Sequence, residues 1–180
     1  MRTGDRAPDI ELLRLDGTPA SLAALAAGRP LVLFFLRHYG CIACHDRVEE
    51  LRARRADYER RAAAVYCVTN GKPEHSAEFC ARREVPFPCV VDRPGEPAYR
   101  AFDLEKVNYR RLFGPSLVEA FAIIARRWRE IETPKSGDVL QMSGTMVLDR
   151  DGVVRLAHHS YYPNDHAADD DVLALLDTLA

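Results

Sequence analysis

Three short runs of apolar residues mark the first half of the chain. Leu31–Leu36 is continuously apolar, Ala64–Thr69 is nearly so, and Phe87–Asp92 is a shorter third run. Each run has the length of a strand, and an unbroken apolar run indicates a strand buried on both faces. Such strands are typical of a parallel sheet covered by helices, so the pattern predicts an α/β fold.

The segments between these runs have helical periodicity. No Gly or Pro interrupts Ile42–Arg61, and Val48, Leu51 and Tyr58 fall on one face of the helix predicted there. The order strand–helix–strand–helix–strand requires right-handed crossovers and parallel central strands. The two further helices predicted in this part of the chain are Glu74–Arg83 and Pro97–Phe102.

The two ends of the chain carry additional elements. Pro8–Leu15 is expected to be extended, and Ser21 is placed to cap a short helix over Leu22–Ala27. Thr145–Leu148 and Val153–Ala157 flank a short polar turn and predict a hairpin. The closing helix is predicted at Asp169–Leu179.

Residues 103–137 break this alternation. Leu117, Phe121, Ile124 and Trp128 recur there at helical spacing, which predicts an inserted helix. Packing of that helix against the sheet is the first expectation, and a lid or a homodimer contact are the alternatives. Residues 1–180 are therefore predicted to form one domain with an insertion at about 103–137.

Composition narrows the class of protein. The 180 residues are 47% hydrophobic with a net charge of -2, which suits a globular core and gives no basic field for nucleic acid. No apolar run is long enough to span a bilayer and no secretory signal is recognisable, so we expect a cytosolic protein without membrane contact. In a reducing cytosol the five cysteines are expected to be free, metal-bound or catalytic.

Cys41 and Cys44 form the motif that carries chemistry. They follow a buried strand and a short loop, and they open a long predicted helix. The partial positive charge of a helix N-terminus favours thiolate over thiol, and a spacing of three residues lets the two sulfurs meet. Arg37, His38 and His45 lie close in sequence and are candidates for tuning the thiolate. Cys41 is expected to be the more exposed sulfur.

Other interpretations of the motif are weaker. A zinc site needs two more ligands, and neither a second Cys-x-x-Cys nor a His-x-x-x-His pair is present. The string CIACH at residues 41–45 also fits covalent haem attachment, which normally takes place outside the cytosol. His158 and His159 are adjacent, so on a strand they point to opposite faces and do not share a metal. We therefore expect a redox dithiol and no metal or organic cofactor.

The order of elements and the CIAC motif resemble the thioredoxin superfamily. Gly4–Asp9 is similar to the N-terminal segment of its peroxiredoxin-like branch, and Gly144–Asp149 followed by Asp151-Gly152 is similar to that branch's late hairpin. The Cys-x-x-Cys motif narrows the resemblance to the peroxiredoxin-like 2 group, of the alkyl hydroperoxide reductase/thiol-specific antioxidant type. The resemblance implies a thioredoxin-like three-layer sandwich with a central mixed sheet, an N-terminal extension and a helical insertion.

The resemblance also implies an activity. It predicts thiol-dependent reduction of a hydroperoxide or related peroxy substrate through a Cys41/Cys44 dithiol–disulfide cycle, with a thioredoxin-type reductant. Aligned as a peroxiredoxin, the chain places the attacking thiol at Cys44; aligned as a thioredoxin, it places that thiol at Cys41. A protein disulfide reductase and a non-catalytic redox sensor or binding protein are the alternatives.

The chain departs from both families near the late strand. Ser143 stands where peroxiredoxins carry an arginine, for which Arg37 or Arg110 are the candidate substitutes. Gly144 stands where thioredoxins carry a cis-proline. The first departure removes the arginine that activates the peroxide in peroxiredoxins. The second removes the proline that helps position the backbone of a partner protein in thioredoxins.

The remaining cysteines are expected to be structural. Cys67 lies within an apolar strand and is interpreted as a small buried hydrophobic residue. Cys80 lies on a predicted helix and Cys89 at the edge of a strand, and each is also a lesser candidate for a resolving thiol.

Overall fold

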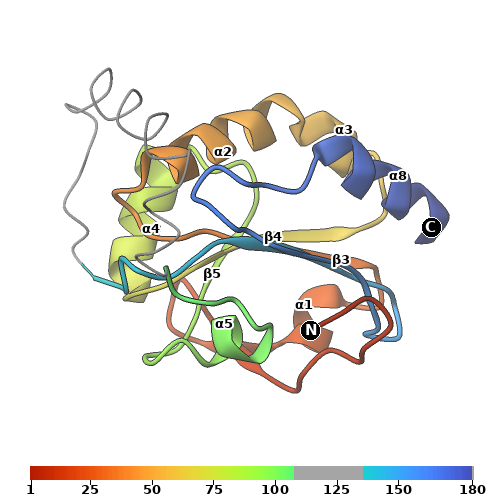
Figure 1. Cartoon of the computed structure of the whole chain (residues 1–180), viewed down its shortest axis with the longest axis horizontal. Helices are drawn as coiled ribbons and strands as arrows, with labels where there is room; N and C mark the ends of the chain where they lie inside the picture. Colours follow the sequence, from red (N-terminus) through yellow and green to blue (C-terminus); the bar gives the residue numbers. More distant parts are fainter. Residues whose placement is uncertain (108–135, 180) are drawn as a thin grey trace.

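A mixed seven-stranded sheet forms the centre of the protein, with strand order β2-β1-β5-β4-β3-β6-β7. A computed structural model describes residues 1–107 and 136–179 (Figure 1). The strands are β1 (Glu11–Arg14), β2 (Pro19–Ser21), β3 (Leu31–Phe35), β4 (Ala64–Thr69), β5 (Cys89–Val91), β6 (Gly144–Leu148) and β7 (Val154–His159). The helices are α1 (Leu22–Ala26), α2 (Ile42–Ala53), α3 (Arg55–Glu59), α4 (Pro73–Arg82), α5 (Pro97–Ala101) and α8 (Asp169–Leu179).

The strand before the cysteine motif lies in the middle of this sheet. β3 pairs in parallel with β4 and antiparallel with β6, so both of its edges are occupied. Every residue of β3 is buried, because helices cover both faces of the sheet. The prediction of a buried parallel centre is confirmed, and β1, β6 and β7 add the antiparallel pairs that make the sheet mixed.

Helices form a layer on each face of the sheet (Figure 1). α2, α3, α4 and α8 contribute Val48, Tyr58, Phe79 and Leu176 to one apolar cluster with the facing side of the sheet. α1 and α5 lie on the opposite face, where Leu25 packs in a second cluster. The three-layer thioredoxin-like sandwich predicted from the sequence is therefore the observed architecture.

The long predicted helix is interrupted, which corrects the sequence prediction of one element over Ile42–Arg61. Arg54 has φ -99° and ψ 5°, outside the helical region, and it separates α2 from α3. Its guanidinium pairs with Asp57 at 2.6 Å and with Asp170 of α8 at 2.7 Å. Tertiary contacts of this kind override a continuous helical pattern, because propensity alone is a weak determinant.

The N-terminal extension joins the hairpin edge of the sheet. The amide of Gly4 donates to the carbonyl of Val154, and the amide of Val154 donates to the carbonyl of Asp5. At the other end of the sheet, Lys106 and Gln141 form an isolated antiparallel bridge, so the two sides of the predicted insertion lie next to each other. The inserted helix itself was predicted within residues that lie mostly outside the described part of the chain.

The helices of residues 1–107 and 136–179 include no candidate membrane span. Each of them is too short or too polar to span a bilayer. That residues 1–180 form a single domain stays a prediction.

A buried ion pair fastens α8 to α2. Arg47 is buried, donates two hydrogen bonds to Asp169 at 3.0 and 2.7 Å, and lies with its guanidinium carbon 5.0 Å from the ring centroid of Phe34. The hydroxyl of Tyr58 donates to the same carboxylate at 2.5 Å. One acidic residue in the first turn of α8 therefore satisfies polar groups from both α2 and α3.

Replacing Asp169 by Ala is expected to destabilise the fold by about 3–5 kcal/mol, because the buried charge of Arg47 loses its bidentate partner. The free energy of unfolding would be measured by urea denaturation at neutral pH. Asp171→Ala, at an exposed position of the same helical turn, is the matched control and should change stability by less than about 0.5 kcal/mol. Equal midpoints for the two variants would contradict the proposed role of the ion pair.

Candidate active site

The cysteine motif lies where the central strand meets the first turn of α2. Cys41 is the residue immediately before α2, and its carbonyl accepts hydrogen bonds from the amides of Cys44 and His45 at 3.0 and 3.1 Å. The loop that leads to it starts after Phe35, and the amide of Cys41 donates back to the carbonyl of His38 at 3.1 Å. The chain thus turns tightly from strand to helix, which places both sulfurs at the helix N-terminus.

Both sulfurs are free thiols enclosed by the protein. Cys41 is 6% exposed and Cys44 is 1% exposed, so Cys41 is the more exposed of the two, as its position in the sequence predicts, although both are buried. The side chain of Arg37 donates from Nη1 to the sulfur of Cys41 at 3.5 Å. The main-chain amide of the same arginine donates to the sulfur of Cys44 at 3.2 Å. One residue therefore contacts both members of the pair.

These contacts separate the acidities of the two thiols. A hydrogen bond from Cys44 and the positive charge of Arg37 lower the pKa of Cys41 to about 6, although burial opposes the shift. The same hydrogen bond, now donated by Cys44, raises the pKa of Cys44 well above its usual value, and burial adds to that rise. At neutral pH the arrangement favours a thiolate at Cys41 and a protonated thiol at Cys44.

A distant segment of the chain holds the arginine in place. Nε of Arg37 donates to the carbonyl of Gln141 at 3.2 Å, and Nη2 donates to the carbonyl of Val139 at 3.3 Å. The fully buried side chain of Gln141 in turn donates to the carbonyl of Leu104 at 2.8 Å. The guanidinium is therefore fixed by backbone carbonyls just before β6, a contact that sequence spacing could not reveal.

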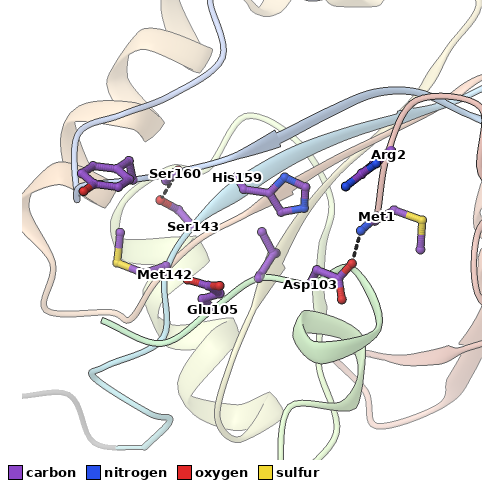
Figure 2. Close-up of a pocket in the computed structure, with 10 residues that line it drawn as sticks. Met1, Arg2, Asp103, Glu105, Met142, Ser143, His159 and Ser160 are labelled. Carbon is purple, nitrogen blue, oxygen red and sulfur yellow. Dashed lines mark hydrogen bonds and ion pairs between the residues drawn. The ribbon is translucent and has the colours of Figure 1, made fainter. Parts of the chain in front are cut away.

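Ser143, which stands where peroxiredoxins carry an arginine, is buried and bonds to a second serine. Its hydroxyl donates to the hydroxyl of Ser160 at 2.9 Å. Both serines line a pocket of about 400 Å³ at the end of β6 and β7, together with Met142, His159 and Glu105 (Figure 2). Neither the cysteine pair nor Arg37, His38 and His45 line this pocket. The other candidate substitute, Arg110, lies outside the described residues.

The two histidines next to the motif have different surroundings. Nε2 of the buried His45 lies 2.8 Å from the carbonyl of Tyr39, and its ring packs 6.0 Å from that of Phe79. Burial, followed by the charges of Arg37 and His45, lowers the pKa of His38 to about 4, so His38 is neutral at neutral pH. His45 thus supports the loop, and His38 adds no positive charge to the site.

Gly144 begins β6 in a space that admits no side chain. A Cβ atom at this position would lie 2.4 Å from Cδ2 of Leu104 and 2.8 Å from the carbonyl oxygen of His158. Close packing between β6, β7 and the segment after α5 therefore requires a glycine at this position, where thioredoxins carry proline.

The expectation that the cysteines are free, metal-bound or catalytic, and do not form structural disulfides, is wrong for Cys80 and Cys89. Cys80 of α4 and Cys89 of β5 form a disulfide, with their Cα atoms 6.9 Å apart. The short connection between the helix and the strand brings them together, a pairing that the sequence interpretation did not make. Cys67 is a free buried thiol, and burial raises its pKa to about 12, so it is chemically inert at neutral pH.

The histidines near the C-terminus do not converge on a metal site. Nε2 of His158 lies 3.2 Å from the carboxylate of Asp165, whereas Nε2 of His159 lies 2.9 Å from the carbonyl of Phe102 near α5. Within residues 1–107 and 136–179, no group of three or more His, Cys, Asp or Glu side chains is arranged to hold a metal ion.

Fold and site together define a class of protein. A thioredoxin-like sandwich that carries a Cys-x-x-Cys pair with divided acidities at a helix N-terminus is a thiol-dependent oxidoreductase. A family model described as the AhpC/TSA family matches residues 3–157. The chain belongs to this family.

Curated relatives support the same assignment. Peroxiredoxin-like 2C from Bos taurus is 24% identical over 176 residues, which cover 93% of this chain and 77% of the relative. Peroxiredoxin-like 2C from Mus musculus matches with the same identity and coverage. The peroxiredoxin-like resemblance stated from the motifs is thereby confirmed.

Solved structures share the fold. Peroxidoxin BcpB from Mycobacterium tuberculosis has a TM-score of 0.69 and 22% identity, with 100% of this chain and 99% of that chain covered. A thiol:disulfide interchange protein of the DsbE type from Chlorobium tepidum has a TM-score of 0.63 and 20% identity, with 99% of this chain and 96% of that chain covered. The same architecture thus occurs in proteins named for peroxide chemistry and for disulfide exchange.

The lowered pKa of Cys41, about 6, predicts the pH dependence of its reactivity. Only the thiolate reacts with iodoacetamide, so alkylation of Cys41 in the pre-reduced protein should be half-maximal near pH 6 and level at pH 8. Peptide mass mapping would follow Cys41 and Cys44 in the same samples, and Cys44 should remain unlabelled throughout. A Cys41 profile that still rises above pH 8 would contradict the lowered pKa.

Arg37→Met is expected to raise the pKa of Cys41 by about one unit or more, because the sulfur loses a charged hydrogen-bond donor. Arg37→Lys keeps the charge without the planar set of donors, so a smaller rise is expected. The measurement is the same alkylation profile, with circular dichroism to verify folding. If both variants kept the wild-type profile, the guanidinium would not be a source of the thiolate's stability.

Proposed function

We propose that the chain reduces hydroperoxides through a Cys41/Cys44 dithiol–disulfide cycle in which Cys41 attacks and Cys44 resolves. The observation that carries the proposal is the division of acidity across the pair: Cys41 accepts hydrogen bonds from Arg37 and Cys44, and Cys44 is held protonated. This favours the thioredoxin-like assignment of the attacking thiol over the peroxiredoxin-like alignment, which places it at Cys44.

The first step consumes the peroxide. The Cys41 thiolate attacks the distal oxygen of the hydroperoxide, the O–O bond breaks, and the leaving alkoxide takes a proton from solvent to become an alcohol. Cys41 is left as a sulfenic acid. Arg37 is the cation at the reacting sulfur, and its guanidinium would stabilise the negative charge that moves onto the leaving oxygen.

The second step forms the disulfide. The sulfur of Cys44 attacks the sulfur of Cys41 and displaces hydroxide, which leaves as water with the proton of the Cys44 thiol. The spacing of the motif supports this step, because Cys41 directly precedes α2, Cys44 lies in its first turn, and the Cys44 amide already donates to the Cys41 carbonyl. A thioredoxin-type dithiol would then return two electrons and restore both thiols.

Protein disulfide reduction is the second candidate. It is favoured by Ser143, which leaves the position before β6 without the arginine of peroxiredoxins and points to Ser160 instead. A Cys41 thiolate backed by a protonated Cys44 also suits attack on a disulfide. The cytosolic location and a homodimer, both raised by the sequence, stay predictions.

The test is the rate at which the pre-reduced protein consumes hydrogen peroxide and tert-butyl hydroperoxide, followed by alkylation and intact mass. We expect consumption at least about a hundredfold faster than by a free thiol at the same pH, with a Cys41–Cys44 disulfide as product. Cys41→Ser should abolish the reaction, and Cys44→Ser should accumulate a sulfenic acid at Cys41 that dimedone traps. Cys67→Ala is the matched cysteine control and should react as the wild type does.

Each contrary outcome has a distinct meaning. A peroxide rate equal to that of a free thiol, with rapid reduction of a protein disulfide, would replace the first proposal by the second. Negligible turnover of both substrates would leave redox sensing as the function. A sulfenic acid on Cys44 in the Cys41→Ser variant, formed at the wild-type rate, would reverse the order of attack.

A further inference from the structure

The Cys80–Cys89 disulfide joins α4, which packs against the active-site loop, to β5 of the central sheet. Cys80 lies in the last turn of α4 and is partly exposed, whereas Cys89 is the buried first residue of β5. Cys41, Cys44 and Cys67 are free thiols in the same molecule. The proposed catalytic cycle makes no use of this disulfide, so its role needs a separate explanation.

α4 also forms one wall of the active-site loop. Phe79, which directly precedes Cys80, packs 5.4 Å from the ring of Tyr39 and 6.0 Å from the ring of His45. These two residues are linked to each other by the hydrogen-bond contact between His45 and the Tyr39 carbonyl, and they enclose the motif on either side. The position of Phe79 therefore bears on how tightly the loop before Cys41 is closed.

Other contacts would hold α4 on the sheet without the disulfide. Ser76, in the middle of α4, contacts the hydroxyl of Thr69 at the end of β4, and Phe79 is buried in the cluster that this helix shares with α2. The disulfide holds the C-terminal end of the helix at Cys80, where Arg52 of α2 also donates to the carbonyls of Arg83 and Glu84. Its loss would thus loosen that end and the neighbouring Phe79, not unfold the domain.

We propose that Cys80–Cys89 is a second redox site, opened by a dithiol, whose state controls access to the Cys41 thiol. In the disulfide state Phe79 is held against Tyr39 and His45, and Cys41 is 6% exposed. In the dithiol state the loop relaxes and Cys41 becomes more accessible. The proposal takes Cys41 as the reactive thiol, as the proposed function does, but it does not require a peroxide substrate.

The exchange chemistry follows from the accessibility of the two sulfurs. A thiolate of the external dithiol attacks the sulfur of the partly exposed Cys80, the S–S bond breaks, and the Cys89 thiolate leaves and takes a proton. The second thiol of the reductant then attacks the mixed disulfide and releases Cys80, which is protonated in turn. The protein gains two electrons and two protons, and the external dithiol becomes a disulfide.

Cys67 does not divert this exchange. It lies opposite Cys89 in the register of β4 and β5, so it is the nearest cysteine along the sheet. Burial raises its pKa to about 12, so it carries almost no thiolate at neutral pH and is a poor nucleophile. Thiol–disulfide exchange within the protein is therefore confined to Cys80 and Cys89.

The experiment uses the full chain with Cys44→Ser, in which Cys80–Cys89 is the disulfide to be opened. One sample is treated with excess dithiothreitol and freed of it under nitrogen, and the other is left untreated. Peptide mass mapping then follows the rate at which iodoacetamide labels Cys41. We expect dithiothreitol to open the disulfide with an unchanged far-ultraviolet circular dichroism spectrum, and the labelling rate of Cys41 to rise at least threefold.

Cys80→Ser/Cys89→Ser in the same background is the matched control, and its Cys41 rate should equal that of the treated sample in both conditions. The proposal is overturned if the disulfide opens only in denaturant, or if it opens and the Cys41 rate stays within a factor of 1.5. Should the double variant fail to fold, the treated and untreated samples decide alone. Alkylation needs no peroxide, so the change in the Cys41 labelling rate can be interpreted even if the proposed peroxidase activity is absent.

Discussion

The candidate site depends on the hydrogen bonds that Arg37 donates. Its main-chain amide contacts the sulfur of Cys44, its guanidinium contacts the sulfur of Cys41, and the same guanidinium binds the carbonyls of Val139 and Gln141. β3 positions the arginine, because Arg37 lies two residues after Phe35, the last residue of this central strand. The antiparallel pairing of β3 with β6 brings the second segment to it, since Phe35 lies opposite Gly144.

This arrangement differs from the family pattern in where the arginine comes from. The family resemblance leads one to look for it just before β6, where Ser143 stands and faces Ser160. Here the segment before β6 contributes backbone carbonyls, and the loop after β3 contributes the cation. A positive charge at the thiolate is thus retained although Ser143 stands at the usual position of the arginine, which separates charge stabilisation from the residue that usually supplies it.

The central strands, the crossover helices and the position of the cysteine motif could all be predicted, because each leaves a local pattern of apolar residues and spacing. The interruption of the long helix at Arg54 could not be predicted. The sequence there is helical throughout, and the ion pair of Arg54 with Asp170 of α8 is a tertiary contact. The pairing of Cys80 with Cys89 and the contact of Arg37 with Gln141 depend on where distant elements come to rest.

Gly144 limits how this site can change over evolutionary time. Its missing side chain leaves room for Leu104 and for the carbonyl of His158, so even an alanine there would have to displace both of them. Proline is larger still and also lacks the amide with which a strand residue can pair. A proline at this position therefore requires both the Leu104 side chain and the backbone of β7 at His158 to move. A single substitution of this glycine by proline therefore does not convert the present site into a thioredoxin-type site.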